Sequence, residues 1–472
     1  MPDAITRKME EKKGSPEVVS STGGQKEKPA EAVVGIDPAS VAGKAMVEVI
    51  AGVDVHKRML AVVVRIVRAD GKLEYQKRKF GTTRQELEMH LMSYLQFYGV
   101  TMVVMESTAQ YWRPVWYALE KHFELRLVNP LQVKAPRGKK QDYRDAQRLA
   151  DRWAASDLQA SYVPGQEQRE WRLMTRQRDH LRKRIGVTRN LVEGLLESGT
   201  YKLSSVVSDI FGATGWAVLQ LIAKGETKVD VLVKEARGSL RKKESALREA
   251  LKGEFTVVYR LALQQYLAQV ALYRAQIEEL NRQLSEAMKH HLAALTRLMK
   301  IPGVDLYGAQ ELLAEIGPKA AAFPSADQFA SWVGVCPGSK ESAGVNYSSR
   351  SAKGNRFLRR LLLQVAWAAI HTKETFFAGL FKRLKPSIEG KGAAWAVAHR
   401  IARVVWLVLH QEVEYQEKGP GQVSPRTLSK KLKRILKECA RHGIDPRKIM
   451  SEIPESELLP VQTSDADAEA TI

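Results

Sequence analysis

Apolar residues in the first third of the chain fall in short runs separated by polar turns, a pattern typical of β-strands with helices between them. The run at 47–55 is rich in β-branched residues, and a second run at 59–70 ends on Asp70 and Gly71, a pair that favours a tight hairpin. Further strands are predicted at 72–80, 100–107 and 124–130, and helices at 84–99, 112–122 and 142–155.

Three strands joined by tight turns, followed by alternating helices and strands, predict a mixed α/β sheet covered by helices, in the order of a ribonuclease-H-like fold. Beyond residue 156 the pattern is helical. Charged stretches with heptad-like spacing at 169–197 and 267–299 predict long helices that pack as a coiled coil or bundle. A homo-oligomer (dimer or tetramer) built on this arm and a plain helical domain both fit that spacing.

A compact all-α domain is predicted at 298–415. Its first part, 298–317, has the form of a helix–hairpin–helix element, in which free backbone N–H groups at the turn of Pro302 and Gly303 can bind a DNA phosphate. Two apolar helices are predicted after it, at 358–372 and 393–413.

The two ends of the chain differ from the rest in composition. The first 46 residues are rich in Lys, Glu, Gly, Ser, Pro and Ala without apolar periodicity, which predicts a disordered tail. Beyond 416 we expect a linker, a basic helix and an acidic tail. The chain is therefore divided into five segments: 1–46, 47–155, 156–297, 298–415 and 416–472.

Several classes of protein are excluded. We find no uninterrupted apolar run of membrane-spanning length and no signal-peptide core at the N-terminus. Two cysteines, Cys336 and Cys439, are too few for a disulfide framework or a cysteine-based zinc cluster. We therefore expect a cytoplasmic protein without a membrane partner, whose metal sites use oxygen ligands.

The net charge changes this picture most. Lys and Arg total 74 against 53 acidic residues, a formal charge of +21. The basic excess lies in the body: residues 47–450 hold 67 basic and 40 acidic side chains, a net charge of +27. Such an excess predicts a polyanionic partner, because each phosphate neutralised by Lys or Arg releases counterions.

Four carboxylates in the predicted α/β segment are candidates for a metal site. Asp54 ends the first strand and Glu106 ends the fourth, each after a buried-looking run, while Asp142 and Asp145 share one face at the start of a helix. Oxygen-only clusters suit Mg²⁺, and four carboxylates suit two ions about 4 Å apart that clamp a phosphodiester. Singly, each acid could instead be a turn residue or a cap, and Asp145 could pair with a neighbouring arginine such as Arg144 or Arg148.

The segment 333–357 combines small residues with five serines and several cations. A serine hydroxyl can attack phosphorus when cations stabilise the charge, and a serine- and glycine-rich loop can equally well bind phosphate without chemistry. From residue types alone both remain open. The residues expected to contact nucleic acid, here and elsewhere, are Lys139, Lys140, Pro302, Gly303, Lys340, Lys353, Asn355, Arg356, Arg359 and Arg360.

Six stretches resemble a known family. GVDVHKR (52–58), VVMESTAQYW (103–112) and KKQDYRDAQRLA (139–150) are similar to the three acidic motifs of the DEDD insertion-sequence transposases, the IS110 and IS1111 group. Three further stretches resemble the C-terminal domain of the same family and occur in the same order: MKIPGVDLYGAQELLAEIG (299–317), ASWVGVCPGSKESAG (330–344) and AKGNRFLRRLLLQVAW (352–367).

The resemblance implies a RuvC-like first domain, a serine-containing second domain, Mg²⁺, donor and target DNA, and a structured guide RNA. Asp54, Glu106, Asp142 and Asp145 match the tetrad of the family, and Ser342 matches its nucleophilic serine. The sequence departs from the family at 109, where alanine replaces the glycine after the Glu-X-Thr motif. The expected function is a transposase or recombinase, and the alternatives are a metal-dependent Holliday-junction nuclease and a non-catalytic nucleic-acid scaffold.

Overall fold

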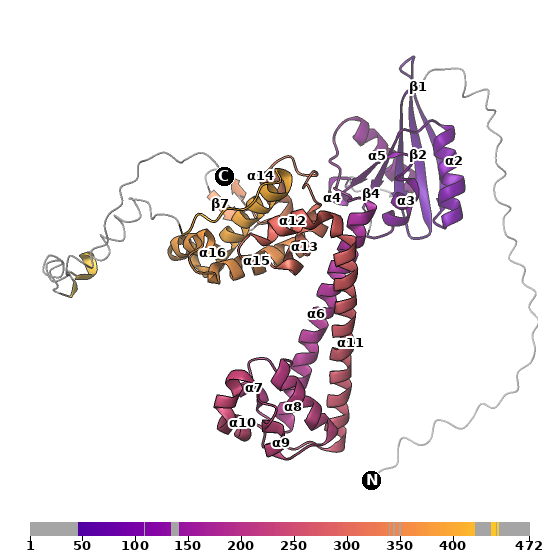
Figure 1. Ribbon diagram of the computed structural model, residues 1–472. Helices are drawn as coiled ribbons and strands as arrows, with labels where there is room; N and C mark the ends of the chain where they lie inside the picture. Colours follow the sequence, from indigo (N-terminus) through magenta and orange to yellow (C-terminus); the bar gives the residue numbers. More distant parts are fainter. Residues whose placement is uncertain are drawn as a thin grey trace, which may run out of the picture. The chain divides into compact units, whose positions relative to one another are not determined.

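The computed structural model describes residues 46–107, 109–133, 141–338, 340–342, 345–348, 351–420, 436–439 and 441–442. The chain divides into two compact units between Val163 and Pro164 (Figure 1). Most of the expected tail at 1–46 and most of 416–472 lie outside the described residues, as do Lys139 and Lys140. The five-segment division of the chain stays a prediction.

The first unit is built on a five-stranded mixed sheet with the strand order β3-β2-β1-β4-β5. Its strands are β1 (Met46–Val55), β2 (Met59–Arg68), β3 (Leu73–Gly81), β4 (Met102–Glu106) and β5 (Glu124–Val128). The first three pair antiparallel, whereas β4 is parallel to β1 and β5 is parallel to β4. This order confirms the predicted ribonuclease-H-like sheet, including its hairpin at Gly71, where φ is +79°.

Side-chain alternation along β1 assigns one set of residues to each face of the sheet. Val49, Val53 and Val55 belong to a core formed with η1 (Glu86–Leu91), α2 (Met92–Phe97) and α3 (Trp112–Leu119). Ile50 belongs to a second core on the opposite face, with residues of α4 (Pro130–Val133) and α5 (Asp142–Ala154). The expected helix at 84–99 is therefore present, with its first turn widened to a π-helix.

Helix α5 lies very close to the sheet because β1 has no side chain at Gly52. A Cβ atom at that position would lie 1.9 Å from the backbone oxygen of Ala146. Asp151, further along α5, accepts a 2.8 Å hydrogen bond from the Tyr75 hydroxyl and lies 3.4 Å from Nε of Arg65. Asp151 thus fastens α5 to β2 and β3.

The second unit begins with two long helices, α6 (Gln166–Ser198) and α11 (Val257–Ala287), which pack along one another (Figure 1). They confirm the predicted long helices. The chain between them forms a small helical bundle with its own apolar core, which the heptad pattern did not predict. Its members are α7 (Leu203–Val206), α8 (Ala213–Lys224), α9 (Val229–Val233), η2 (Gly238–Lys243) and α10 (Glu244–Ala250).

The rest of the second unit is mainly helical, as predicted. It contains η3 (Lys289–His291), α12 (Leu292–Met299), α13 (Leu306–Ile316), α14 (Ala326–Val333), α15 (Arg356–His371) and α16 (Phe376–His410). A short antiparallel hairpin of β6 (Lys340–Ser342) and β7 (Val345–Ser348) was not expected. Among the described helices, α16 is long and apolar enough to be a membrane-span candidate, although 56% of its most apolar window is buried inside the protein, as in a core helix.

Candidate functional site

The four predicted acids come from three elements of the first unit that meet at one end of the sheet. Asp54 and Glu106 each lie one residue beyond Val53 and Met105, the last paired residues of the neighbouring parallel strands β1 and β4. Side chains at paired positions point to the same face. Asp54 shares the face of Ile50 and Gly52, which α5 covers.

Asp142 and Asp145 occupy the first turn of α5. Residues three apart on a helix lie on the same side. The close approach of α5 at Gly52 brings this turn to the strand end, so that Oδ1 of Asp142 lies 3.5 Å from Nε2 of His56, which in turn lies 3.1 Å from Oδ2 of Asp54. The structure thus brings together acids that are far apart in the sequence.

Two features of the carboxylates fit a bound cation. Asp54 is 7% exposed, so a charge there is costly without a counter-charge. Asp145 accepts a 2.8 Å hydrogen bond from Arg148 through Oδ1, while its other oxygen, Oδ2, is buried and has no hydrogen-bond partner among the described residues. An orphaned carboxylate oxygen beside other carboxylates suits a divalent metal ion.

The pKa of Asp54 reflects both its burial and the negative charges beside it. Burial raises the pKa of Asp54 above its ordinary value, His56 opposes that change, and the carboxylates of Asp145 and Asp142 raise the pKa further. These interactions identify the three aspartates as neighbours. A divalent cation would relieve their mutual repulsion.

His56 is a member of the site that the sequence reasoning missed. One ligand atom each from Asp54, His56 and Asp142 lie within 4.8 Å of one another, a grouping that could hold a metal ion. The histidine is part of the GVDVHKR stretch, two residues beyond Asp54. Its position directly after the strand that carries Asp54 was the available signal.

The serine segment belongs to the second unit. Ser342 is the last residue of β6, and its backbone pairs with that of Val345 in β7. The segment returns to the helical core at α15, where the Asn355 side chain caps the helix by accepting hydrogen bonds from the N–H groups of Phe357 and Leu358. Arg359 donates to the backbone oxygen of Gly334, 2.7 Å away.

Arg359 therefore connects the two ends of the serine segment. In addition to Gly334, it donates to the Ser351 hydroxyl at 3.1 Å and to the backbone oxygen of Ala352. The Arg360 guanidinium also has a protein partner, since it lies 2.5 Å from Asp179 of α6. That Arg359 and Arg360 contact a phosphate stays a prediction.

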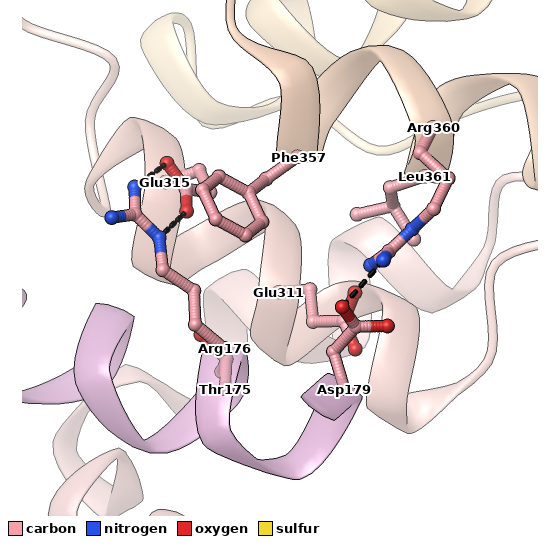
Figure 2. A pocket seen from close by; sticks show the side chains of 8 residues that line it. All are labelled: Thr175, Arg176, Asp179, Glu311, Glu315, Phe357, Arg360 and Leu361. Carbon is pink, nitrogen blue, oxygen red and sulfur yellow. Dashed lines mark hydrogen bonds and ion pairs between the residues drawn. The ribbon is translucent and has the colours of Figure 1, made fainter. Parts of the chain in front are cut away.

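Figure 2 shows a small pocket where α6, α13 and α15 meet beneath the start of α15. Arg176 of α6 makes two hydrogen bonds, of 2.8 and 3.0 Å, to the buried carboxylate of Glu315. The same carboxylate accepts a 3.0 Å bond from Asn355. Glu315 of α13 thus connects Arg176 of the long helix α6 with Asn355, the cap of α15 at the end of the serine segment.

The other residues expected to contact nucleic acid have mixed positions. Lys353 and Arg356 are exposed, whereas the turn at Pro302 and Gly303 packs against α15: a Cβ atom at Gly303 would lie 2.6 Å from the backbone oxygen of Val365. Lys340 belongs to β6. That these residues bind nucleic acid stays a prediction.

Comparison with known proteins gives two family matches in the order predicted. Residues 51–200 match a transposase model of the DEDD class of IS110, and residues 295–378 match the transposase family IS116/IS110/IS902. The first match contains the acidic site and the second contains the serine segment. Two regions of the chain are thus similar to the IS110 group of transposases.

A curated relative is a putative transposase, y4pF/y4sB, of Sinorhizobium fredii (strain NBRC 101917 / NGR234). It is 31% identical over 161 residues, which are 32% of this chain and 40% of the relative. The chain thus spans about two fifths of that relative. A solved structure of T. thermophilus RuvC in complex with a Holliday junction substrate shares 15% identity over 24% of this chain and 99% of that chain, with a TM-score of 0.19. The fold assignment given above rests on strand order alone.

Proposed function

We propose that the protein is a DNA transposase that cleaves and rejoins strands to move an insertion sequence. The observation that carries this proposal is the acidic site: Asp54 and Glu106 end adjacent parallel strands on the face covered by α5, whose first turn supplies Asp142 and Asp145. The similarity of two regions to transposase families supports this reaction class for the site. The strong basic excess of the body supports DNA as its partner.

The acidic site would hold Mg²⁺ through Asp54, Glu106, Asp142 and Asp145. Mg²⁺ binds carboxylates together with substrate phosphate oxygens, and when bound it neutralises charge on the phosphate under attack. The role of Asp145 is supported by its buried, unpartnered oxygen. The role of Arg148 would be to orient Asp145 by holding its other oxygen.

Ser342 would be the nucleophile. Its hydroxyl oxygen would form a bond to phosphorus as the bond from phosphorus to the 3′ oxygen of the DNA breaks, and the serine proton would pass to that leaving oxygen. The 3′-hydroxyl of another strand would then attack the phosphoserine, restoring a phosphodiester and the free serine. The matched family region and the hairpin end at Ser342 support this assignment.

A structured guide RNA would select the two DNA sites, as the resemblance to the family implies. The basic body could bind RNA and DNA alike. Purifying the protein from cells that carry its gene with flanking DNA, and sequencing the RNA that remains bound, tests this part separately. Loss of bound RNA when the flanking DNA is removed is the expected result.

A trapping experiment tests the chemistry. Wild-type protein is incubated with Mg²⁺ and donor DNA containing the ends of its element, then denatured and searched for protein covalently joined to DNA. Asp54→Asn and Ser342→Ala should give no adduct, while both variants bind DNA almost as tightly as the wild type. Ser348→Ala, in the other strand of the hairpin, is the matched control and should keep the adduct.

Each other outcome rejects part of the proposal. An undiminished adduct in Ser342→Ala moves the nucleophile to another residue. Efficient cleavage without an adduct indicates a nuclease that uses water. Binding without any cleavage, unchanged when the metal is chelated, indicates a scaffold without catalysis.

A further inference from the structure

Lys79 is a cation inside the acidic site that neither the motifs nor the predicted list of contacts includes. Its Nζ lies 3.5 Å from Oδ2 of Asp142 and 5.5 Å from the centre of the Tyr143 ring. Lys79 belongs to β3, the edge strand of the sheet. The pairing register places it in one row with Ala61 and Asp54, so these three side chains share the face that α5 covers.

The edge strand runs alongside α5 with matched contacts at both ends. Tyr75 of β3 holds Asp151 in the second half of α5, while Lys79 reaches Asp142 in the first turn. Four residues of strand span about 13 Å. Nine residues of helix span about the same length. The position of Lys79 is therefore fixed by the same register that fastens α5, rather than by a chance encounter of surface side chains.

Lys79 and Asp142 are both partly exposed, so either side chain can take another partner. The Lys79 side chain is 49% exposed and that of Asp142 is 34% exposed. An ion pair this open contributes little to stability, so Lys79 can leave Asp142 at small cost. Lys57 and Arg58, in the turn that follows Asp54 and His56, are exposed as well, and the hydroxyl of Thr82 at the end of β3 donates to the backbone oxygen of Lys57. The turn after β1 thus carries two more exposed cations.

We propose that Lys79 exchanges partners during the reaction: it holds Asp142 while the site has no metal, and binds a non-bridging oxygen of the DNA phosphate once Asp142 binds the cation. This inference rests on the proposed function, because it needs both a metal and a phosphate at the site. An ammonium group can bind either a carboxylate or a phosphate oxygen as a point charge. The partner exchange links metal binding to DNA binding through one side chain.

The test measures binding alone, with the full-length protein. Mn²⁺ affinity is measured by electron paramagnetic resonance without DNA, and affinity for a fluorescent 20-base-pair duplex of arbitrary sequence is measured with and without Mn²⁺. Lys79→Ala should bind Mn²⁺ roughly three- to tenfold more tightly, since a positive charge beside a ligand is removed. It should bind DNA several-fold more weakly with Mn²⁺ present, and nearly as the wild type does without it.

Two variants complete the design. Lys79→Arg keeps the charge and should restore most of the Mn²⁺-dependent DNA affinity. Lys72→Ala removes an exposed lysine at the far end of the same hairpin and should change neither metal affinity nor the effect of Mn²⁺ on DNA binding. Thermal unfolding of each variant establishes that it is folded.

The remaining outcomes overturn the inference in distinguishable ways. Equal loss of DNA affinity with and without Mn²⁺ makes Lys79 part of a general basic surface. No change in either affinity makes its ion pair with Asp142 a surface contact without function. A wild-type protein that binds no Mn²⁺ removes the metal from the proposed function, and the partner exchange with it. Failure to trap a serine adduct, by contrast, leaves the Lys79 result intact.

Discussion

Gly52 controls the geometry of the acidic site although it carries no functional group. The Cβ of any other residue would lie 1.9 Å from the backbone oxygen of Ala146, in the turn of α5 that follows Asp142 and Asp145. Backbone atoms cannot move aside as a flexible side chain can. Gly52→Ala must therefore push α5 away from β1 and separate the acids of the helix from Asp54.

We expect Gly52→Ala to lower the free energy of unfolding by about 1–3 kcal/mol, the usual cost of overpacking a core. Mn²⁺ affinity should fall as well, because the carboxylates separate. Denaturant unfolding and metal titration measure the two effects. Gly194→Ala is the matched control: in the last two turns of α6 its Cβ meets no atom within 4 Å, so it should stabilise the protein slightly. A Gly52→Ala protein with wild-type stability and metal affinity would contradict the close contact.

Ala109 is strained at the loop after Glu106. Its φ of +47° lies in the left-handed region, which costs an L-residue about 1–2 kcal/mol. Glycine adopts this conformation freely but loses more entropy on folding. We therefore expect Ala109→Gly to stabilise the protein by about 0.5–1 kcal/mol, seen as a higher denaturation midpoint. A lower midpoint would show that the loop does not keep this backbone conformation in solution.

At the scale of elements, the ends of α5 and of the strands could be predicted because they are marked by residues that are close together in the sequence. Strand alternation and the pair Asp70 and Gly71 gave the antiparallel hairpin. The bundle between α6 and α11 could not be found in the same way, because its helices are short and their apolar residues meet only in three dimensions. The hairpin of β6 and β7 was not predicted because strands of three or four residues are too short to show an alternation of apolar and polar residues.

The junction of α6 with α15 should depend on pH through Asp179. Burial alone would raise the pKa of Asp179, but hydrogen bonds from Arg360 and Lys183 hold it below its ordinary value. A carboxyl group with a lowered folded pKa stabilises the fold above its unfolded pKa of about 3.9. This contribution is lost as the pH falls through the folded pKa.

Asp179→Asn should therefore destabilise the protein at neutral pH, and its difference from the wild type should shrink below about pH 4. Thermal unfolding between pH 3 and 8 (within the range where both proteins refold) measures this. Asp230→Asn is the control, since Asp230 pairs with Arg248 on the surface and should change stability little. A pH-independent effect of Asp179→Asn would mean that packing, and not charge, joins the helices.

At the scale of the whole molecule, the sequence predicted the carboxylates better than the cations that accompany them. Asp54 and Glu106 follow buried runs, and a carboxylate in that position is conspicuous. Arg148 could be anticipated from its spacing of three residues from Asp145. Lys79 is an ordinary basic residue among many in the sequence, and only the strand register brings it to the site. The protein partners of Arg359 and Arg360 could not be predicted for the same reason, because these partners are distant in sequence.

The charge of the body gives the last prediction. Ion pairs such as those of Arg176 and Arg360 remove equal numbers of both signs, so the net +27 of residues 47–450 stays available to phosphates. DNA affinity should therefore fall steeply with salt, each neutralised phosphate adding about 0.7–0.9 to the slope of log affinity against log salt concentration.

Deleting residues 1–45, which hold seven basic and seven acidic side chains, should leave the slope unchanged. Deleting 451–472, with six acids and no base, should tighten binding at low salt. A flat salt dependence would assign the excess charge to solvation of the surface and remove its support for a nucleic-acid partner.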